Sequence, residues 1–329
     1  MRNLISTSCS SARIATAAVA AFLMAAPAAH AAQLSNDART SIPRDVQQII
    51  VVDYRAMQNS PAAMTLKDRI MPPELKRLEQ ALVSSGLKVD SDTDALAFTS
   101  FRAPNPDGKG GQVERIVGIA QGQFRTRDVI ANLTKNKTKF EKVRNNIIYP
   151  MGAGGFDVTF VNQTTMVFGD RDAVHAAVDA RDGYAPSFLT NSDMVNEMAQ
   201  VDTHSIWSLL DPKGTQTMMK SVLGEAAQLA DYDTVKNRIG DSHYTMDFAN
   251  GVRFAMTVDM SDTFTAATCS TLMKGVALLR KQQGSAQEKL AIDNTSISSS
   301  SGKLIVDYSS SDSEFASLLT SPLFQSVVK

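Results

Sequence analysis

The sequence predicts an α+β fold made of two tandem, similar units, each with an antiparallel-rich sheet and helices packed on one face. The composition is that of a globular protein, with 43% hydrophobic and 20% charged residues. Candidate strands of the second half alternate apolar and polar residues, the period of a sheet with one face on helices and the other in water. The same order of elements occurs twice, and the corresponding residues Ile116 and Phe254 lie 138 positions apart.

The first unit is expected over residues 32–182. A strand over 48–53 is followed by a helix with Ser60 as N-cap and Pro61 as its first residue. Two prolines at 72 and 73 interrupt that helix, which resumes and ends near Gly86. The remaining elements are strands over 95–101, 115–120, 146–149, 156–161 and 165–169, a helix over 128–135, and a helix over 172–180 capped by Asp170. Residues 183–202 are expected to form a linker helix.

The second unit is expected over residues 203–329. The turn 249–251 tests its register, because a two-residue loop would mix apolar and polar side chains on one face. A three-residue loop with Gly251 left-handed pairs Met246 with Phe254 and keeps the apolar face together. The elements are strands over 205–210, 243–248, 253–260 and 303–308, a helix from Asp211-Pro212, a helix containing Cys269, and a helix from Ser311 with Glu314 completing a capping box.

The N-terminus has the layout of a secretory signal peptide. Arg2 and Arg13 precede an apolar run over 14–26, and a small-residue cleavage site places the cut between Ala31 and Ala32. We therefore expect residues 1–31 to be removed and the mature protein to be periplasmic or secreted. The alternative is an uncleaved anchor, but the apolar run is shorter than the roughly 20 residues that span a bilayer. No later segment is expected to cross a membrane.

Four segments carry a resemblance: IPRDV at 42–46, WSLLDPKGT at 207–215, YDTVK at 232–236 and SPLFQSVV at 321–328. Because of these four segments, the chain resembles uncharacterised exported proteins of Gram-negative soil bacteria over most of its mature length. None of these motifs has a catalytic role. The resemblance therefore implies kinship and export, and it transfers no functional residue.

Motifs for cofactors, metals and catalysis are not found. A net charge of -1 argues against a nucleic-acid partner. Residues 90–94 alternate oxygens like a calcium loop, but Ala95 and Phe101 stand where glycine and glutamate are required, so a solvated turn is expected. The glycines over 152–155 do not open a helix and form no phosphate loop. The histidines have no metal-ligand spacing. We therefore expect no cofactor, no metal and no catalytic residue that a motif nominates.

The number of cysteines predicts a fold that is stabilised by its hydrophobic core and not by disulfides. Cys9 leaves with the signal peptide and Cys269 remains alone, so no internal disulfide is expected. Cys269 lies in a helix-like stretch, and we expect it to be a buried small hydrophobic residue.

One candidate ligand site follows from the strand pattern. Arg253, Asp259 and Asp307 fall on the sheet face opposite the helices, and two half-covered sheets lying side by side would leave a groove between the units. The planar Arg253 fork would then bind a carboxylate or phosphate. The alternative is an ordinary wet sheet surface with cross-strand Arg–Asp pairs.

Three classes of function stay open at this stage. The favoured class is a non-catalytic exported protein that binds a small ligand or an envelope partner. The second is an enzyme, hydrolase-like, whose residues converge only in three dimensions. The third is a membrane-tethered structural protein of the envelope. A buried carboxylate or histidine with a strongly shifted pKa in a cleft would favour the enzyme.

Overall fold

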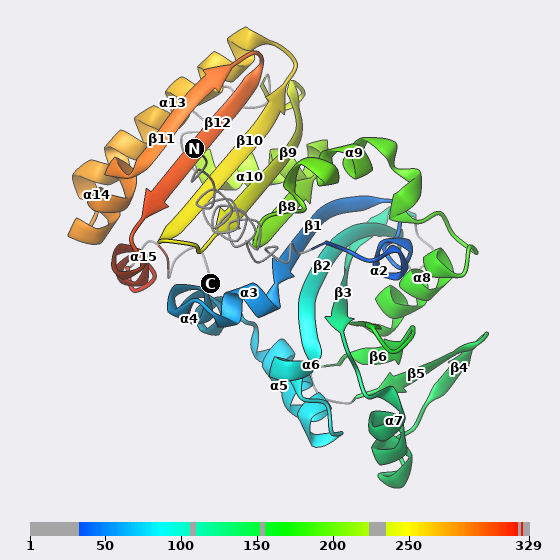
Figure 1. The fold of residues 1–329 in the computed structure, drawn as a ribbon. Helices are drawn as coiled ribbons and strands as arrows, with labels where there is room; N and C mark the ends of the chain where they lie inside the picture. Colours follow the sequence, from blue (N-terminus) through cyan, green and yellow to red (C-terminus); the bar gives the residue numbers. More distant parts are fainter. Residues whose placement is uncertain (1–32, 106–109, 152–154, 224–234, 322–323, 325–329) are drawn as a thin grey trace, which may run out of the picture. The chain divides into compact units, whose positions relative to one another are not determined.

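The computed structural model describes residues 33–105, 110–151, 155–223, 235–321 and 324. Within these residues the strands form one sheet of 12 strands in the order β11-β12-β10-β9-β8-β1-β2-β3-β7-β6-β5-β4 (Figure 1). Every neighbouring pair is antiparallel. The predicted α+β class with antiparallel strands is thus confirmed. The predicted N-terminal signal with its Ala31–Ala32 cleavage site, and the glycine loop at 152–154, lie outside the described residues.

The two halves of the chain meet at the centre of this sheet. The first half contributes β1 (Val46–Asp53), β2 (Thr93–Pro104), β3 (Gln112–Gly122), β7 (Thr165–Gly169), β6 (Asp157–Phe160), β5 (Asn146–Pro150) and β4 (Glu141–Val143). The second contributes β8 (Ile206–Leu210), β9 (Ile239–Asp247), β10 (Val252–Met260), β12 (Lys303–Ser310) and β11 (Thr295–Ser300). Because β1 and β8 are hydrogen-bonded neighbours, the expectation of two sheets with a groove between them is wrong.

Residues Ile49 and Ile50 of β1 define the two faces of the sheet, because successive side chains of a strand point to opposite sides. In the first half, the Ile49 face is covered by α2 (Asn36–Thr40), α8 (Arg171–Arg181) and α9 (Ser192–Val201). Helix α8 starts as predicted, with the Asp170 side chain accepting from the Ala173 amide. Helix α9 lies in the segment predicted to be a linker helix. Its Met194, Met198 and Val201 pack into the buried core.

The Ile50 face of the first half is covered by a second group of helices, so the prediction that helices pack on one face only is wrong for this half. These helices are α3 (Tyr54–Gln58), α4 (Pro61–Ile70), α5 (Pro73–Ser84), α6 (Val89–Asp92) and α7 (Thr126–Lys135). As predicted, the Ser60 side chain caps α4 and Pro61 is its first residue. The chain turns extended at Met71 and Pro72, which separates α4 from α5.

In the second half, the Ile50 face packs against α10 (Pro212–Leu223), α13 (Thr263–Gln283) and α15 (Asp312–Leu318). Met246 pairs with Phe254 and Gly251 has a φ of 98°, which confirms the predicted turn. The predicted capping box of Ser311 and Glu314 is present. Cys269 is 1% exposed, as expected, and burial raises the pKa of its thiol. Strand β11 and helix α14 (Ala286–Asp293) were not predicted.

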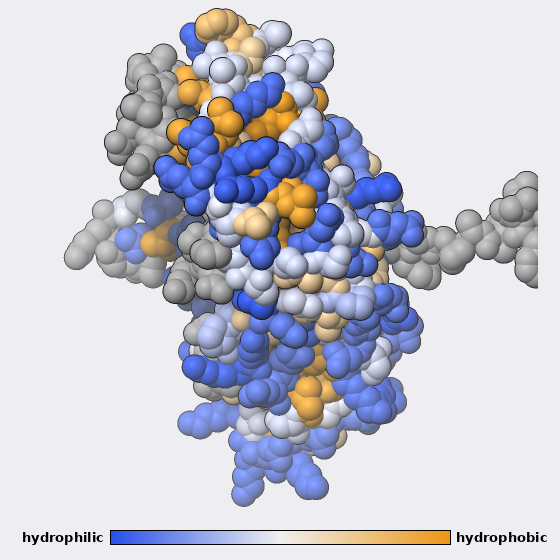
Figure 2. All heavy atoms as spheres, turned by 90° about the vertical axis from the view of Figure 1, so that its left-hand side faces the viewer, coloured by the Kyte–Doolittle hydropathy of each residue, from blue (hydrophilic) through white to orange (hydrophobic). Residues whose placement is uncertain are grey.

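The surface of the described residues is mixed. Exposed apolar side chains on α13 include Phe264 and Leu278. Figure 2 shows hydrophobic and hydrophilic residues intermixed on the face that it presents. Among the described helices, none combines the length and the apolar character that a bilayer crossing requires.

Candidate functional site

An apolar cavity of about 480 Å³ lies on the Ile50 face of the first half, between the sheet and helices α3 to α5. Its floor comes from β1, β2, β3, β7 and β8, and its roof from the three helices and the Met71–Pro72 link. Of all the residues that line it, Lys67 is the one with a charged side chain. The lining residues are Ile50, Val52, Tyr54, Met57, Leu66, Lys67, Ile70, Met71, Pro72, Leu75, Leu96, Phe98, Ile116, Gly118, Phe156, Phe168, Gly169 and Ile206.

Aromatic rings form the cavity floor. The Phe168 ring lies over Gly118, so closely that a Cβ atom at residue 118 would stand 2.2 Å from ring carbons. Phe98 and Phe156 meet the same ring edge to face, with centroids 6.0 and 6.4 Å away. Because Gly118 has no side chain, the Phe168 ring packs directly against the backbone of β3. The cavity lies above this ring.

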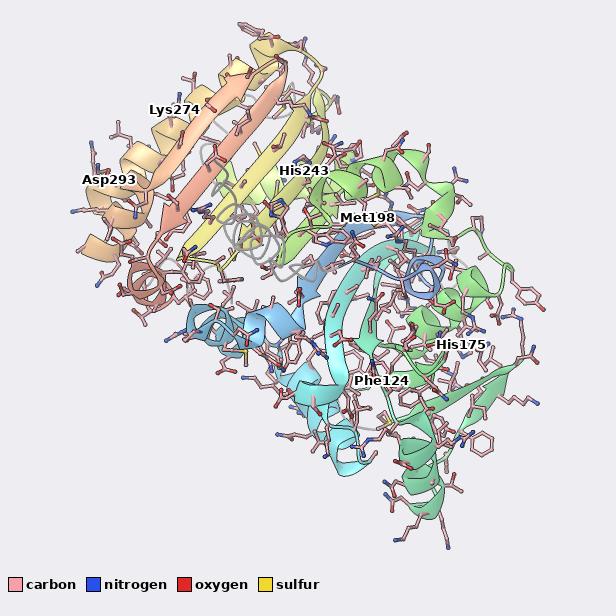
Figure 3. The ribbon with its side chains drawn as sticks, viewed as in Figure 1. Phe124, His175, Met198, His243, Lys274 and Asp293 are labelled. Atoms are coloured by element: carbon pink, nitrogen blue, oxygen red, sulfur yellow. The ribbon has the colours of Figure 1, made fainter. Side chains whose placement is uncertain are left out.

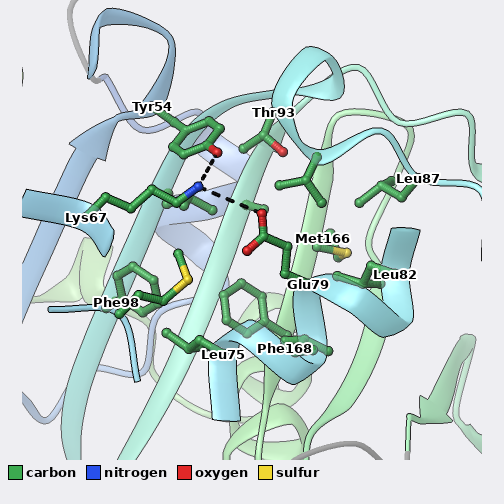
Figure 4. A pocket seen from close by; sticks show the side chains of 15 residues that line it. Tyr54, Lys67, Leu75, Glu79, Leu82, Leu87, Thr93, Phe98, Met166 and Phe168 are labelled. Carbon is green, nitrogen blue, oxygen red and sulfur yellow. Dashed lines mark hydrogen bonds and ion pairs between the residues drawn. The ribbon is translucent and has the colours of Figure 1, made fainter. Parts of the chain in front are cut away.

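A narrower compartment of about 70 Å³ adjoins the main cavity under α5 (Figure 4). The two share Leu75, Phe98 and Phe168 in their walls. Beyond these, the narrow part is lined by Leu78, Leu82, Leu87, Val89 and Met166 among others. The described site is thus a wide apolar space with a slender apolar extension.

A polar cluster lies where the two compartments meet, and it joins helices α3, α4, α5 and α6. Lys67 of α4 donates from Nζ to Tyr54 Oη at 2.6 Å, and its Nζ lies 3.8 Å from Glu79 Oε1 (Figure 4). Tyr54 in turn donates to Asp90 Oδ1 at 2.7 Å. The Lys67 side chain is 14% exposed. This cluster places one ammonium group at the wall of an otherwise apolar space.

Charge at this cluster is maintained by its neighbours. Burial on its own lowers the pKa of Lys67, but the hydrogen bond with Tyr54 and the carboxylates of Glu79 and Asp90 raise it, and the pKa lies above its ordinary value. Burial likewise raises the pKa of the Tyr54 hydroxyl. Lys67 is therefore an ammonium ion and Tyr54 a neutral phenol at neutral pH.

The acidic stretch 90–94 supports this cluster and is not the solvated turn that was expected. Asp90 accepts from Tyr54, Asp94 forms an ion pair with Arg55, and Asp92 is buried and accepts from the Lys88 amide. Residues 90–92 lie in the short helix α6 and residues 93–94 begin β2, and the carboxylates of the stretch are held by protein groups. No group of three or more potential metal ligands occurs among the described residues.

The three residues nominated from the sequence lie elsewhere, on the Ile49 face of the second half. Arg253 and Asp307 line one pocket of about 420 Å³. His204 and Asp247 line it too, and His204 Nδ1 lies 2.6 Å from Asp247 Oδ2. Asp259 is separate from it and accepts from Lys303 Nζ at 2.6 Å. Because β1 and β8 join the halves edge to edge, this pocket belongs to one half of the sheet. The role of these residues as a ligand site stays a prediction.

Asp241 of β9 lies near the carboxylate of Glu197 on α9. Burial and the nearby carboxylates of Glu197, Asp211 and Asp259 raise the pKa of Asp241 to about 6. Two residues along β9, His243 Nδ1 lies 2.6 Å from Glu197 Oε1 of α9. Figure 3 labels His243, and it labels Met198 of the same helix α9. Asp241 is absent from the lining of the four cavities described for this protein.

Comparison with known proteins yields little. No protein-family model and no curated protein matches the sequence. Solved structures with a similar chain path include crystal forms III, IV and I of TP0453. They share 9%, 10% and 11% sequence identity with this chain, with TM-scores of 0.46, 0.44 and 0.45. They match 85%, 86% and 90% of this chain and 96%, 96% and 100% of their own. These values describe a loose similarity of fold.

Tyr54, Lys67 and Glu79 were not singled out from the sequence. They lie on three helices and share no short spacing, so no motif could nominate them. The one available signal was the Pro72-Pro73 break, which predicts two short helices in place of a long one. Two short helices can leave a gap over a sheet, but the pattern does not say where.

Proposed function

We propose that this protein is a non-catalytic binding protein that holds a small apolar molecule in the cavity between α3–α5 and the sheet. The single observation that carries the proposal is the cavity itself: about 480 Å³, with one charged group in its lining. Ligand sites in proteins are concave, mostly apolar and about 300–1,000 Å³ in volume, with a few polar groups that fix orientation.

Packing energetics support the same conclusion. Protein interiors are close-packed, and atoms that face an empty space lose dispersion contacts. The Phe98 and Phe168 rings and the aliphatic side chains around them lose such contacts on the cavity side. A bound apolar molecule restores them and removes apolar surface from water, which contributes about 25 cal/mol per Å².

A neutral fluorescent probe tests this proposal. N-phenyl-1-naphthylamine is apolar and fluoresces more strongly when it leaves water, and we expect saturable binding of one molecule per protein. Val52 lines the cavity, and Val52→Phe puts a ring into the space that the probe needs. We expect this variant to weaken probe binding by about tenfold or more, because a filled cavity forces overpacking when a ligand enters.

A matched variant controls for adsorption of the probe to exposed apolar surface. Val222 on α10 is 40% exposed, so Val222→Phe makes the same chemical change outside the cavity. Binding should equal that of the wild type. If folded Val52→Phe protein binds the probe as well as Val222→Phe does, the cavity is not the binding site and the proposal fails.

We also propose that the protein is exported to the periplasm or secreted after removal of residues 1–31. The support is the sequence: arginines, an apolar run and small residues ahead of Ala32. N-terminal sequencing of the protein from its own cell should read from Ala32. A chain that retains Met1 in the membrane fraction would favour a tethered protein.

The two halves of the sheet, in our proposal, derive from an internal duplication. Outward from the central β1–β8 pair, the halves have the orders β1-β2-β3-β7-β6 and β8-β9-β10-β12-β11, so each strand has a counterpart by its place in the chain and in the sheet. Superposition of residues 45–182 on 203–326 in a crystal structure should align these strand pairs. Strands that overlay in a different order would contradict the duplication.

A further inference from the structure

The position of Lys67 carries an inference about the ligand's chemistry. In the apolar cavity its ammonium is the one charged group, and it lies at the junction with the narrow compartment. The same residue also lines an outer groove between α4 and α5, with Lys76 and Glu79. An ammonium at the wall of an apolar space favours a molecule with an acceptor at one end and hydrocarbon at the other.

We propose that the ligand is an amphipathic carboxylate, whose head group binds Lys67 and whose hydrocarbon chain occupies the cavity. This inference rests on the proposed function, because it assigns a chemical class to the molecule in the same site. It also gives the orientation of the ligand. The head group lies at Lys67 and Tyr54, and the hydrocarbon chain runs toward the Phe98 and Phe168 rings on the cavity floor.

Unused hydrogen-bonding capacity at Lys67 supports this orientation. An ammonium group has three N–H donors, and Lys67 donates one of them to the Tyr54 hydroxyl. Glu79 at 3.8 Å is an ion-pair partner beyond hydrogen-bond distance. A carboxylate that reaches Lys67 from the cavity would form a charge-assisted hydrogen bond, which is about twice as strong as a neutral one.

Glu79 is the group with which such a ligand must compete. It stands on α5, its side chain is 30% exposed, and it also lines the outer groove, where water can solvate it. Asp90 is engaged by the Tyr54 hydroxyl and is not displaced by a group that approaches Lys67. A ligand carboxylate therefore replaces a long and partly solvated contact with a shorter one in an apolar setting.

The test measures displacement of N-phenyl-1-naphthylamine by two chains of equal length, dodecanoate and 1-dodecanol, at pH 8. In wild-type protein we expect dodecanoate to bind about tenfold more tightly than dodecanol, as one charge-assisted hydrogen bond predicts. Lys67→Gln should abolish that preference, whereas Lys67→Arg should retain part of it. Lys76→Gln is the control, because Lys76 lies in the outer groove and not in the apolar cavity.

A second variant distinguishes recognition from a general effect on folding. Glu79→Gln removes the competing carboxylate and should tighten dodecanoate binding severalfold while dodecanol binding stays the same. A merely structural role of the cluster would weaken both ligands together. If Lys67→Gln does not fold, as judged by circular dichroism, the Lys67→Arg and Glu79→Gln results decide the question.

The outcomes separate the two proposals. Equal binding of dodecanoate and dodecanol in the wild type would overturn the head-group assignment and leave the apolar cavity as a binding site. A dodecanoate affinity that Glu79→Gln lowers would also overturn it. Failure of the neutral probe to bind at all would instead overturn the proposed function, and this inference with it.

Discussion

The Ile50 face of the sheet carries a large cavity in the first half, whereas in the second half the described helices pack on it through buried side chains. In the first half, α3 to α5 leave a cavity of about 480 Å³ over β1, β2 and β3. In the second half, α10 and α13 pack on β10 and β12 through Met219, Met256, Met273 and Leu304, which are buried. Outward from the β1–β8 pair, the two halves of the sheet have the same strand order. The difference therefore comes from the helices and from the side chains that the strands present to them.

Two features explain this contrast, one in the helices and one in the side chains that pack between helices and sheet. Helix α13 runs over 21 residues without a proline, whereas the helical cover of the cavity in the first half is divided at Met71–Pro72. Methionine is flexible and fills irregular gaps, so a Met-rich interface closes tightly. The rigid rings of Phe98 and Phe168 do not reach across the gap in this way. The comparison indicates that broken helices and rigid rings keep a space open where a long helix with methionines closes it.

The largest expected effect comes from matched leucine truncations in the two halves. Leu304 is fully buried, and Leu304→Ala should lower the free energy of unfolding by about 3 kcal/mol. Leu96 lines the cavity and is only partly buried, so Leu96→Ala should cost about 1 kcal/mol, because less packing is lost. Urea unfolding of both variants measures the difference. Equal losses would show that the first half is as well packed as the second.

Two glycine-to-alanine substitutions should change the stability of the fold in opposite directions. Gly118→Ala pushes a Cβ into the Phe168 ring and should destabilise the fold by about 1–3 kcal/mol while the ring moves into the cavity. A Cβ atom added at Gly275 in α13 would meet nothing within 4 Å apart from its chain neighbours and the backbone of its own helix, so Gly275→Ala should stabilise the fold by up to about 1 kcal/mol. Thermal unfolding and probe titration of both variants measure this. A Gly118→Ala protein with wild-type stability and probe affinity would contradict the account of the floor.

Helix caps provide a smaller contrast of about 1 kcal/mol each. Ser60 caps α4 over the cavity, and Ser285 caps α14, which does not line it. Ser60→Ala should lower both stability and probe affinity, because α4 positions Leu66 and Lys67. Ser285→Ala should lower stability alone. Probe affinities that fall equally in the two variants would show a global effect in place of a local one.

The smallest effect concerns pH and lies on the opposite face. The pKa of Asp241 is about 6, above the ordinary value of 3.8, so the folded state binds its proton more tightly than the unfolded state does. This contribution is present below pH 4 and is lost as pH rises through 6. After a discount for solvent screening, Asp241→Asn should add about 1 kcal/mol at pH 8 and almost nothing at pH 4. A gain of the same size at both pH values would show that desolvation of this carboxylate is not the cause.

Local rules predicted much of the fold, because caps, turns and strand faces are encoded by neighbours in the chain. The Ser60, Asp170 and Ser311 caps, the Gly251 turn and the burial of Cys269 are all confirmed. The Ser-rich strand β11 was missed because its sequence, TSISSS, has almost no apolar pattern. It gains its place by pairing with β12.

The candidate site could not be predicted, because it depends on distances between elements. The β1–β8 pairing that unites the halves joins residues about 160 positions apart, and no periodicity reports it. Likewise, Lys67 and Glu79 each look like a solvated helix charge in the sequence. Only their position beside Tyr54 and an apolar floor distinguishes them.

Native mass spectrometry of the protein, purified without detergent from its own cells, tests the central claim most directly. We predict a wild-type mass that exceeds the chain mass by one small molecule, which organic solvent extracts and which the Val52→Phe protein lacks. Wild-type protein at the bare chain mass that also fails to bind the neutral probe, or an adduct present equally in Val52→Phe, would contradict a ligand site in this cavity.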